Sequence, residues 1–94
     1  MIVVIISTHL RKLLDLYGNI DQIPPKEGYL LLQDWRSQHQ CSLEPTFPEI
    51  EDESMRVYYQ LKPEKEIKES SIQTLRQLDG IDGAYKKADE GLPN

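Results

Sequence analysis

Two stretches of the chain carry apolar patterns that are typical of β-strands. Residues 2–7 begin with β-branched and apolar side chains on both faces, which indicates a central strand and not an alternating edge strand. Residues 55–61 instead alternate strictly between apolar and more polar side chains, which predicts a strand with one buried face. Its core-facing members are Met55, Val57, Tyr59 and Leu61, and its outward members are Arg56, Tyr58 and Gln60.

Between these two strands, apolar residues recur at helical spacing in two places. The first place predicts a short amphipathic helix near 9–17, with Thr8 as its N-cap and Gly18 as its stop. The second predicts the main helix at 25–39, although Gly28 weakens it by about 1 kcal/mol relative to alanine. The predicted buried faces are Leu10, Leu13, Leu14 and Tyr17 in the first helix, and Gly28, Leu31, Leu32, Trp35 and His39 in the second.

The remaining patterns add two strands and one more helix. Residues 41–47 alternate as a strand, and Pro45 within them favours an edge position because proline cannot donate to a sheet. A helix is predicted at 70–79, with Ser70 or Ser71 as its cap. The Asp79-Gly80 turn then leads into a final strand at 81–87.

The resulting order is β-α-β-β-α-β with an extra helical turn after the first strand. This order predicts an α+β domain of the ferredoxin-like plait type, with a four-stranded antiparallel sheet and two helices on one face. The length of 94 residues allows one domain, which we place at 1–87, followed by an extended tail at 88–94.

Two helices leave the second face of such a sheet open. On the first strand, alternation puts Val3 and Ile5 on the face opposite to Ile2, Val4 and Ile6. An open face with Val3, Ile5 and Tyr58 at its centre and polar groups around it is typical of a protein-binding patch. Alternatively, the helix near 9–17 folds over this face and closes it, and periodicity alone does not decide between the two arrangements.

Charge and cysteine content narrow the partners and the compartment. Acidic residues outnumber basic ones by 16 to 11, and no basic stripe interrupts the net charge of −5, so nucleic acid and anionic membranes are disfavoured partners. The single cysteine, Cys41, argues for a reducing compartment. The short apolar N-terminus lacks a basic flank and a cleavage site, so a cytoplasmic location is expected unless the protein follows an exported partner.

Few residues suggest catalytic or metal chemistry. His9, His39 and Cys41 do not show a spacing that is typical of zinc sites or of a Cys–His nucleophile pair, and Cys41 is expected to be a partly buried structural residue. The acidic loop at 48–53 has no glycine cradle or pocket that would separate the pKa values of paired carboxylates. We therefore expect a binding protein, and not an enzyme, with no cofactor and no metal.

Four segments of the chain resemble the propeptide domain of bacterial subtilisin-like serine proteases. They are the opening strand, the helix and strand that run from Leu31 to Pro48, the aromatic strand Val57-Tyr58-Tyr59-Gln60-Leu61, and the ending from Leu75 to Tyr85. The resemblance covers most of the chain except residues 8–24 and the acidic loop. Here the domain is expected to act as a separate chain, so the resemblance implies an inhibitor or a folding chaperone supplied in trans.

The resemblance also implies how the partner is bound. In such propeptides the open sheet face docks on two surface helices of the protease, acidic side chains cap those helices, and the tail lies in the substrate cleft like a product. The expected protease contacts are Val3, Ile5 and Tyr58 on the face, Glu49, Glu51, Asp52 and Glu53 in the acidic loop, Tyr85 at the root of the tail, and Ala88, Asp89, Glu90, Gly91, Leu92, Pro93 and Asn94 in the tail. The protein is then a monomer when free and a heterodimer with the protease.

Three other functions remain open on the sequence. A small-molecule-sensing module of the same topology needs a glycine-bearing turn after the first strand, and Ser7-Thr8-His9-Leu10 matches this poorly. An enzyme needs a constellation of catalytic residues that we do not find. A regulatory or immunity-type interaction domain with an unrelated partner fits the same surfaces, and the sequence does not separate it from the protease inhibitor.

Overall fold

A computed structural model describes residues 1–47, 49, 51, 52 and 54–86 of the chain. It shows a small α+β domain in which the strands form one open, antiparallel sheet. In chain order the elements are β1 (Ile2–Ile6), α1 (Thr8–Tyr17), the 3-10 turns η1 (Ile20–Gln22) and η2 (Pro25–Glu27), α2 (Leu30–Gln38), β2 (Cys41–Pro45), β3 (Tyr58–Pro63), α3 (Glu69–Arg76) and β4 (Ile81–Lys86).

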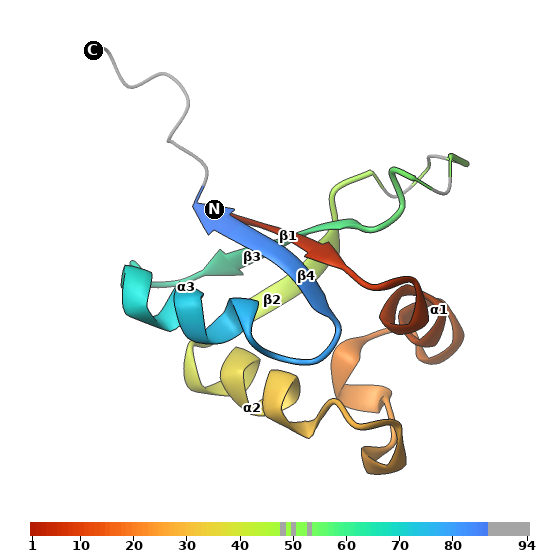
Figure 1. The fold of residues 1–94 in the computed structure, drawn as a ribbon, viewed down its shortest axis with the longest axis horizontal. Coiled ribbons are helices and arrows are strands. Elements are labelled where there is room, and N and C mark those ends of the chain that lie inside the picture. Colours follow the sequence, from red (N-terminus) through yellow and green to blue (C-terminus); the bar gives the residue numbers. More distant parts are fainter. Residues whose placement is uncertain (48, 50, 53, 87–94) are drawn as a thin grey trace.

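The strands lie in the order β2-β3-β1-β4, so β1 and β3 occupy the centre and β2 and β4 form the edges. Every neighbouring pair is antiparallel, and β1 pairs with both β3 and β4 along its length. Helices α2 and α3 lie on one side of this sheet, whereas α1 lies beside the end at which β1 finishes (Figure 1). This arrangement is compatible with a ferredoxin-like plait, and the edge position expected from Pro45 is confirmed.

The core lies between the sheet and the helices, and the alternation of the strands decides which side chains enter it. Ile2, Val4 and Ile6 are at most 2 % exposed, while Val3 and Ile5 between them are half-buried. On β3 the expected facing is confirmed, because Tyr59 and Leu61 are buried. The helices complete the core with Leu10, Leu13, Leu14, Leu32, Trp35, Ile72 and Leu75.

Helix α1 is present as predicted, but its N-cap is Ser7 and not Thr8. The Ser7 hydroxyl accepts a hydrogen bond from the backbone N–H of Leu10, and the helix ends at Gly18, whose φ of 92° only glycine adopts readily. Its apolar stripe packs into the core at the end of the sheet, next to η1. Helix α1 therefore leaves the open face uncovered, and the alternative in which it closes that face is wrong.

The predicted helix at 25–39 is interrupted. Pro24 and Pro25 start a single 3-10 turn, which Gly28 ends with a φ of 92°, so the helix proper begins only at Leu30. The shift rotates the predicted buried face: Leu32 and Trp35 are buried, but Leu31 is 69 % exposed. A left-handed glycine breaks a helix more effectively than its propensity cost suggests, because it changes the direction of the chain.

Smaller corrections concern element ends. Strand β2 stops at Pro45 and β3 starts only at Tyr58, so Met55, Arg56 and Val57 belong to the preceding turn. Helix α3 ends at Arg76, and its N-cap is Lys68, which makes no side-chain capping bond, so Ser70 and Ser71 are not the cap. Strand β4 is described to Lys86, and residue 87 lies outside the described residues.

Candidate functional site on the open face of the sheet

The side of the sheet away from α2 and α3 carries an apolar strip that crosses three strands. Val3 on β1 lies opposite Tyr85 of β4 on one side and Gln60 of β3 on the other. Ile5 lies opposite Tyr58 of β3. Because residues opposite one another in neighbouring strands share a face, the structure brings Tyr85, which was expected at the root of the tail, together with Val3, Ile5 and Tyr58, which the sequence predicted on the open face.

A glycine on β4 leaves room for an apolar side chain of β1 within this strip. Gly83 lies opposite Ile5, and a Cβ atom added there would lie 3.5 Å from the Ile5 Cδ1 atom. The Ile5 side chain therefore extends over the glycine backbone, and Tyr85, two residues further along β4, remains 49 % exposed. The result is an apolar floor with an exposed aromatic ring at its edge.

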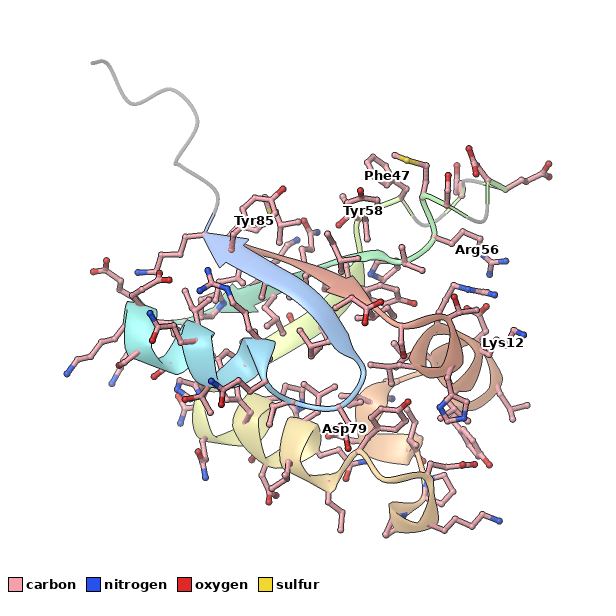
Figure 2. The ribbon with its side chains drawn as sticks, viewed as in Figure 1. Lys12, Phe47, Arg56, Tyr58, Asp79 and Tyr85 are labelled. Carbon is pink, nitrogen blue, oxygen red and sulfur yellow. The ribbon has the colours of Figure 1, made fainter. Side chains whose placement is uncertain are left out.

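Phe47, which follows β2, is a member of the surface that the sequence analysis did not include among the contacts. Its ring meets Tyr58 edge to face, with the ring centroids 6.4 Å apart and the planes at 74°, and the side chain is 39 % exposed. Phe47, Tyr58 and Tyr85 all point away from the helices (Figure 2). Strict alternation over 41–47 would have put Phe47 on the core side with Cys41 and Leu43, so the pattern gave no signal for it; Phe47 reaches Tyr58 because β2 ends at Pro45. We call Val3, Ile5, Phe47, Tyr58 and Tyr85 the apolar strip.

The acidic loop leaves the sheet beside Phe47 and returns at Tyr58, so it borders one end of the strip. Glu49, Glu51 and Asp52 are exposed, whereas Glu53 lies outside the described residues. Asp52 is already engaged, because the Ser54 hydroxyl and backbone N–H both donate to its Oδ1 atom, at 2.7 and 3.0 Å. These hydrogen bonds hold the pKa of Asp52 below its usual range. Glu49 and Glu51 are therefore the described carboxylates that are better placed to meet a partner.

The returning arm of this loop is tied to α1. Arg56, which the sequence placed on the strand pointing outward, instead donates to the Asp15 Oδ2 atom at 2.7 Å. The same oxygen accepts from the buried Arg11 at 2.8 Å. Helix α1 thus helps to position the loop beside the strip. Burial and the nearby Asp15 carboxylate also raise the pKa of Tyr59.

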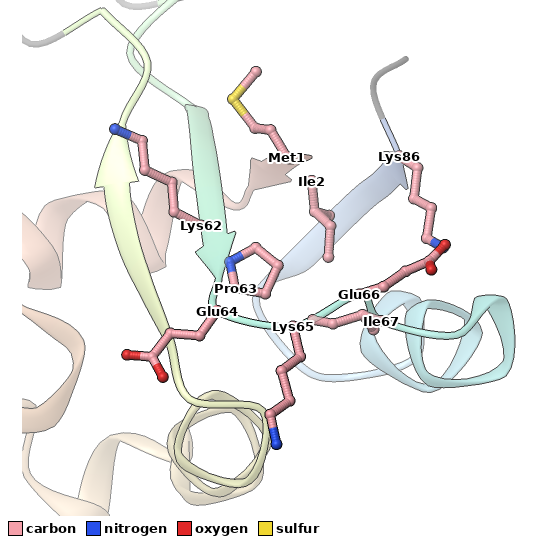
Figure 3. A pocket seen from close by; sticks show the side chains of 9 residues that line it. All are labelled: Met1, Ile2, Lys62, Pro63, Glu64, Lys65, Glu66, Ile67 and Lys86. Atoms are coloured by element: carbon pink, nitrogen blue, oxygen red, sulfur yellow. The ribbon is translucent and has the colours of Figure 1, made fainter. Parts of the chain in front are cut away.

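A shallow cleft of about 590 Å³ lies at the opposite end of the sheet, where β1 begins and β3 and β4 finish (Figure 3). Its apolar floor is formed by Ile2, Pro63 and Ile67, and charged side chains of both signs surround it. Lys86 approaches Glu66 at 3.6 Å across the rim. The rim carries three lysines, Lys62, Lys65 and Lys86, and two glutamates, Glu64 and Glu66, so positive charge is in slight excess.

The histidine and cysteine side chains, whose types commonly take part in catalysis or metal binding, have structural partners here. The His9 Nδ1 atom lies 2.7 Å from the Tyr29 hydroxyl, and the His39 ring stacks on Trp35 with centroids 4.2 Å apart. Cys41 is buried, as expected, and desolvation raises the pKa of its thiol although the Arg36 guanidinium partly opposes this. Within the described part of the chain, no group of three His, Cys, Asp or Glu side chains is gathered as metal ligands.

The tail contacts expected at Ala88, Asp89, Glu90, Gly91, Leu92, Pro93 and Asn94 lie outside the described residues. Across the described ranges, each helix is too short or too polar to cross a membrane. Comparison of the chain with protein-family models, with curated proteins and with solved structures finds no match.

Proposed function

We propose that this protein binds a subtilisin-like serine protease through the open face of its sheet and acts as an inhibitor or folding chaperone in trans. We also propose that the domain is a ferredoxin-like plait, the arrangement that the resemblance to protease propeptides implies. Both proposals agree with the element order and with the central positions of β1 and β3.

The observation that carries the proposal is the apolar strip on the face of the sheet that none of the described helices covers. A small monomeric domain rarely leaves contiguous apolar and aromatic side chains in solvent without a partner to cover them. Tyrosine and phenylalanine are also among the residue types that are enriched at protein interfaces. The strip is flanked by polar Glu44 and Gln60, which gives the patch a polar rim.

The acidic loop supplies a second, electrostatic contact. A carboxylate next to the N-terminus of a helix in the partner is stabilised by about 0.3–1 kcal/mol when exposed and up to about 2 kcal/mol when partly buried. Glu49 and Glu51 are exposed and lie beside the strip, so they can reach a partner that covers Phe47 and Tyr58. Changing both to glutamine should weaken binding and flatten its dependence on salt. A salt dependence identical to that of the unmodified protein would show that the loop stays in solvent.

The C-terminal tail is the proposed inhibitory element. In our proposal it lies extended in the substrate cleft, where backbone pairing gives affinity with little side-chain selectivity. Pro93 hinders cleavage nearby, because proline lacks an N–H and holds φ fixed. A chain ending at Lys87 should therefore still bind the protease, yet lose most of the inhibition. Equal inhibition by the full-length and shortened chains would mean that the tail does not enter the cleft.

The test is binding to a panel of subtilisin-like proteases, followed by calorimetry and by progress curves of peptide hydrolysis. The informative variant combines Tyr58→Ala with Val3→Ser and should weaken binding by at least about tenfold, because truncating an aromatic hot-spot residue costs about 2 kcal/mol or more. Leu31→Ser is the matched control, since Leu31 is also exposed but lies on α2, away from the strip.

The outcome separates the protease from other partners of the same face. Failure to bind any protease of the panel would reject the protease proposal. Binding that the Leu31 control weakens as much as the strip variant would reject the open face as the docking surface. A protein of another class whose binding depends on the strip would instead favour the alternative, a regulatory or immunity-type interaction domain.

A further inference from the structure

The two edge strands of the sheet, β2 and β4, each accept a hydrogen bond from the helix that packs against them. In each case an arginine of the helix reaches the edge and donates a hydrogen bond to a backbone carbonyl of the outer strand. Arg36 of α2 donates to the Cys41 carbonyl of β2 at 3.2 Å, and Arg76 of α3 donates to the Ala84 carbonyl of β4 at 2.6 Å. Arg36 also forms an ion pair with Asp21, and Arg76 forms one with Glu69.

The register shows that these carbonyls point away from the sheet. The Ile6 N–H bonds to the Val57 carbonyl, so the even-numbered residues of β1 direct their backbone groups to β3 and the odd-numbered ones direct theirs to β4. Tyr85 pairs with Val3, so the backbone N–H and C=O groups of Tyr85 point toward β1. Its neighbours Ala84 and Lys86 then present their backbone N–H and C=O groups to the outside.

The two edges differ in how completely they are closed. On β2 the outward residues are Cys41, Leu43 and Pro45; Arg36 occupies the Cys41 carbonyl and Pro45 has no N–H, so two of the three are limited in their ability to pair. On β4, Arg76 occupies one lone pair of one carbonyl. The described residues provide no hydrogen bond to the outward backbone groups of Lys86. Strand β4 is therefore the edge at which a further strand could add.

A second copy of this chain is the strand that fits this edge. An antiparallel pair of β4 strands centred on Ala84 would place Asp82 of each copy near Lys86 of the other, so that opposite charges meet on both sides of the axis. The same arrangement would bring the two Arg76 side chains together at the axis, where their like charges repel. Arg76 therefore lies at the position where its charge opposes the pairing of two β4 strands most directly.

We propose that Arg76 closes the β4 edge and keeps the protein from pairing with a second copy of itself through that strand. Exposed edges are the usual route by which sheets associate, and charged side chains at the edge are a common protection. The closure leaves the open face as the surface of the sheet that is free for a partner. The proposal about Arg76 does not depend on the identity of that partner, so it can be rejected independently of the protease proposal.

The test is the self-association of Arg76→Met, measured by analytical ultracentrifugation over a wide concentration range. Methionine keeps much of the aliphatic stem but removes the donor and the charge. We expect the variant to dimerise at least about tenfold more tightly than the unmodified protein, the factor that corresponds to losing one hydrogen bond to a charged group. Glu69→Gln, which only loosens the arginine, should shift association in the same direction by less.

Two further variants identify the surface that associates. Lys86→Pro removes an outward N–H at the end of β4, and combined with Arg76→Met it should return the protein to the monomer. Arg36→Met should remain monomeric, because Pro45 still limits the β2 edge. The proposal is overturned if folded Arg76→Met and Arg76→Gln both stay monomeric, or if Lys86→Pro leaves the association of Arg76→Met unchanged.

Discussion

The adjacent tyrosines of β3 provide a direct test of which face of the sheet is open. Tyr59 is 7 % exposed and packs in the core, so Tyr59→Ala should cost about 3–5 kcal/mol, the usual range for removing a buried aromatic side chain. Tyr58 lies on the other face, where its main ring contact is the edge-to-face pair with Phe47. Such a pair contributes about 0.5–1.5 kcal/mol beyond area burial, so Tyr58→Ala should cost little more than that.

The comparison is best made by urea unfolding, followed by far-UV circular dichroism, with the two variants matched in concentration and buffer. Domains of this size are stable by only about 5–15 kcal/mol, so the loss at Tyr59 should move the midpoint strongly. We expect the free energy of unfolding to fall at least about twice as far for Tyr59→Ala as for Tyr58→Ala. Equal losses, or a larger loss at Tyr58, would show that our assignment of the two faces is inverted.

Three further predictions concern the folded domain itself. Gly80→Ala should destabilise it more than Gly18→Ala in thermal melts: both glycines have φ near 90°, a cost of about 1–2 kcal/mol, but only at Gly80 would the new Cβ lie 2.6 Å from the Tyr29 ring. Trp35→Phe keeps the ring packing but removes an indole N–H that donates to α3 at 3.0 Å, and should cost about 1 kcal/mol in urea titrations. Burial raises the pKa of the Cys41 thiol, so the stability that the protonated thiol contributes to the fold is complete below its unfolded pKa of about 8.5 and is lost as pH rises toward its folded pKa. Cys41→Ala should therefore flatten the loss of folding stability at alkaline pH, and an unchanged slope would contradict this.

The positions and types of the main elements could be predicted because each pattern reflects burial on one face. The uninterrupted apolar run of β1 marks a strand with neighbours on both sides, and the alternation at β3 correctly separated the buried Tyr59 from the outward Tyr58. The apolar stripe of α1 likewise predicted the helix and its buried leucines, Leu10, Leu13 and Leu14, whereas Tyr17 is only partly buried and Arg11 is buried although the stripe did not include it. These signals are local, so one sequence was sufficient to detect them.

The errors occurred where backbone conformation or distant contacts prevailed. The proline pair and Gly28 permit either a continuous helix with a weak point or a 3-10 turn followed by a new helix, and the left-handed conformation of Gly28 is what separates them. Leu31 was placed in the core because its spacing fits the longer helix, and it became exposed once the helix started at Leu30. The binding roles of the strip residues, the acidic loop and the tail remain predictions.

The sequence by itself determined the element order, the two faces of the central strands and the acidic, apolar composition of the proposed docking surface, because periodicity and charge are written along the chain. Only the tertiary structure decided that α1 packs at the end of the sheet, that Phe47 joins the apolar strip, and that Arg36 and Arg76 donate hydrogen bonds to carbonyls of the two edge strands. Each of these depends on which residues from distant segments come within contact distance. The direction in which the chain leaves each turn determines which distant residues meet. That direction depends on packing that involves the whole domain.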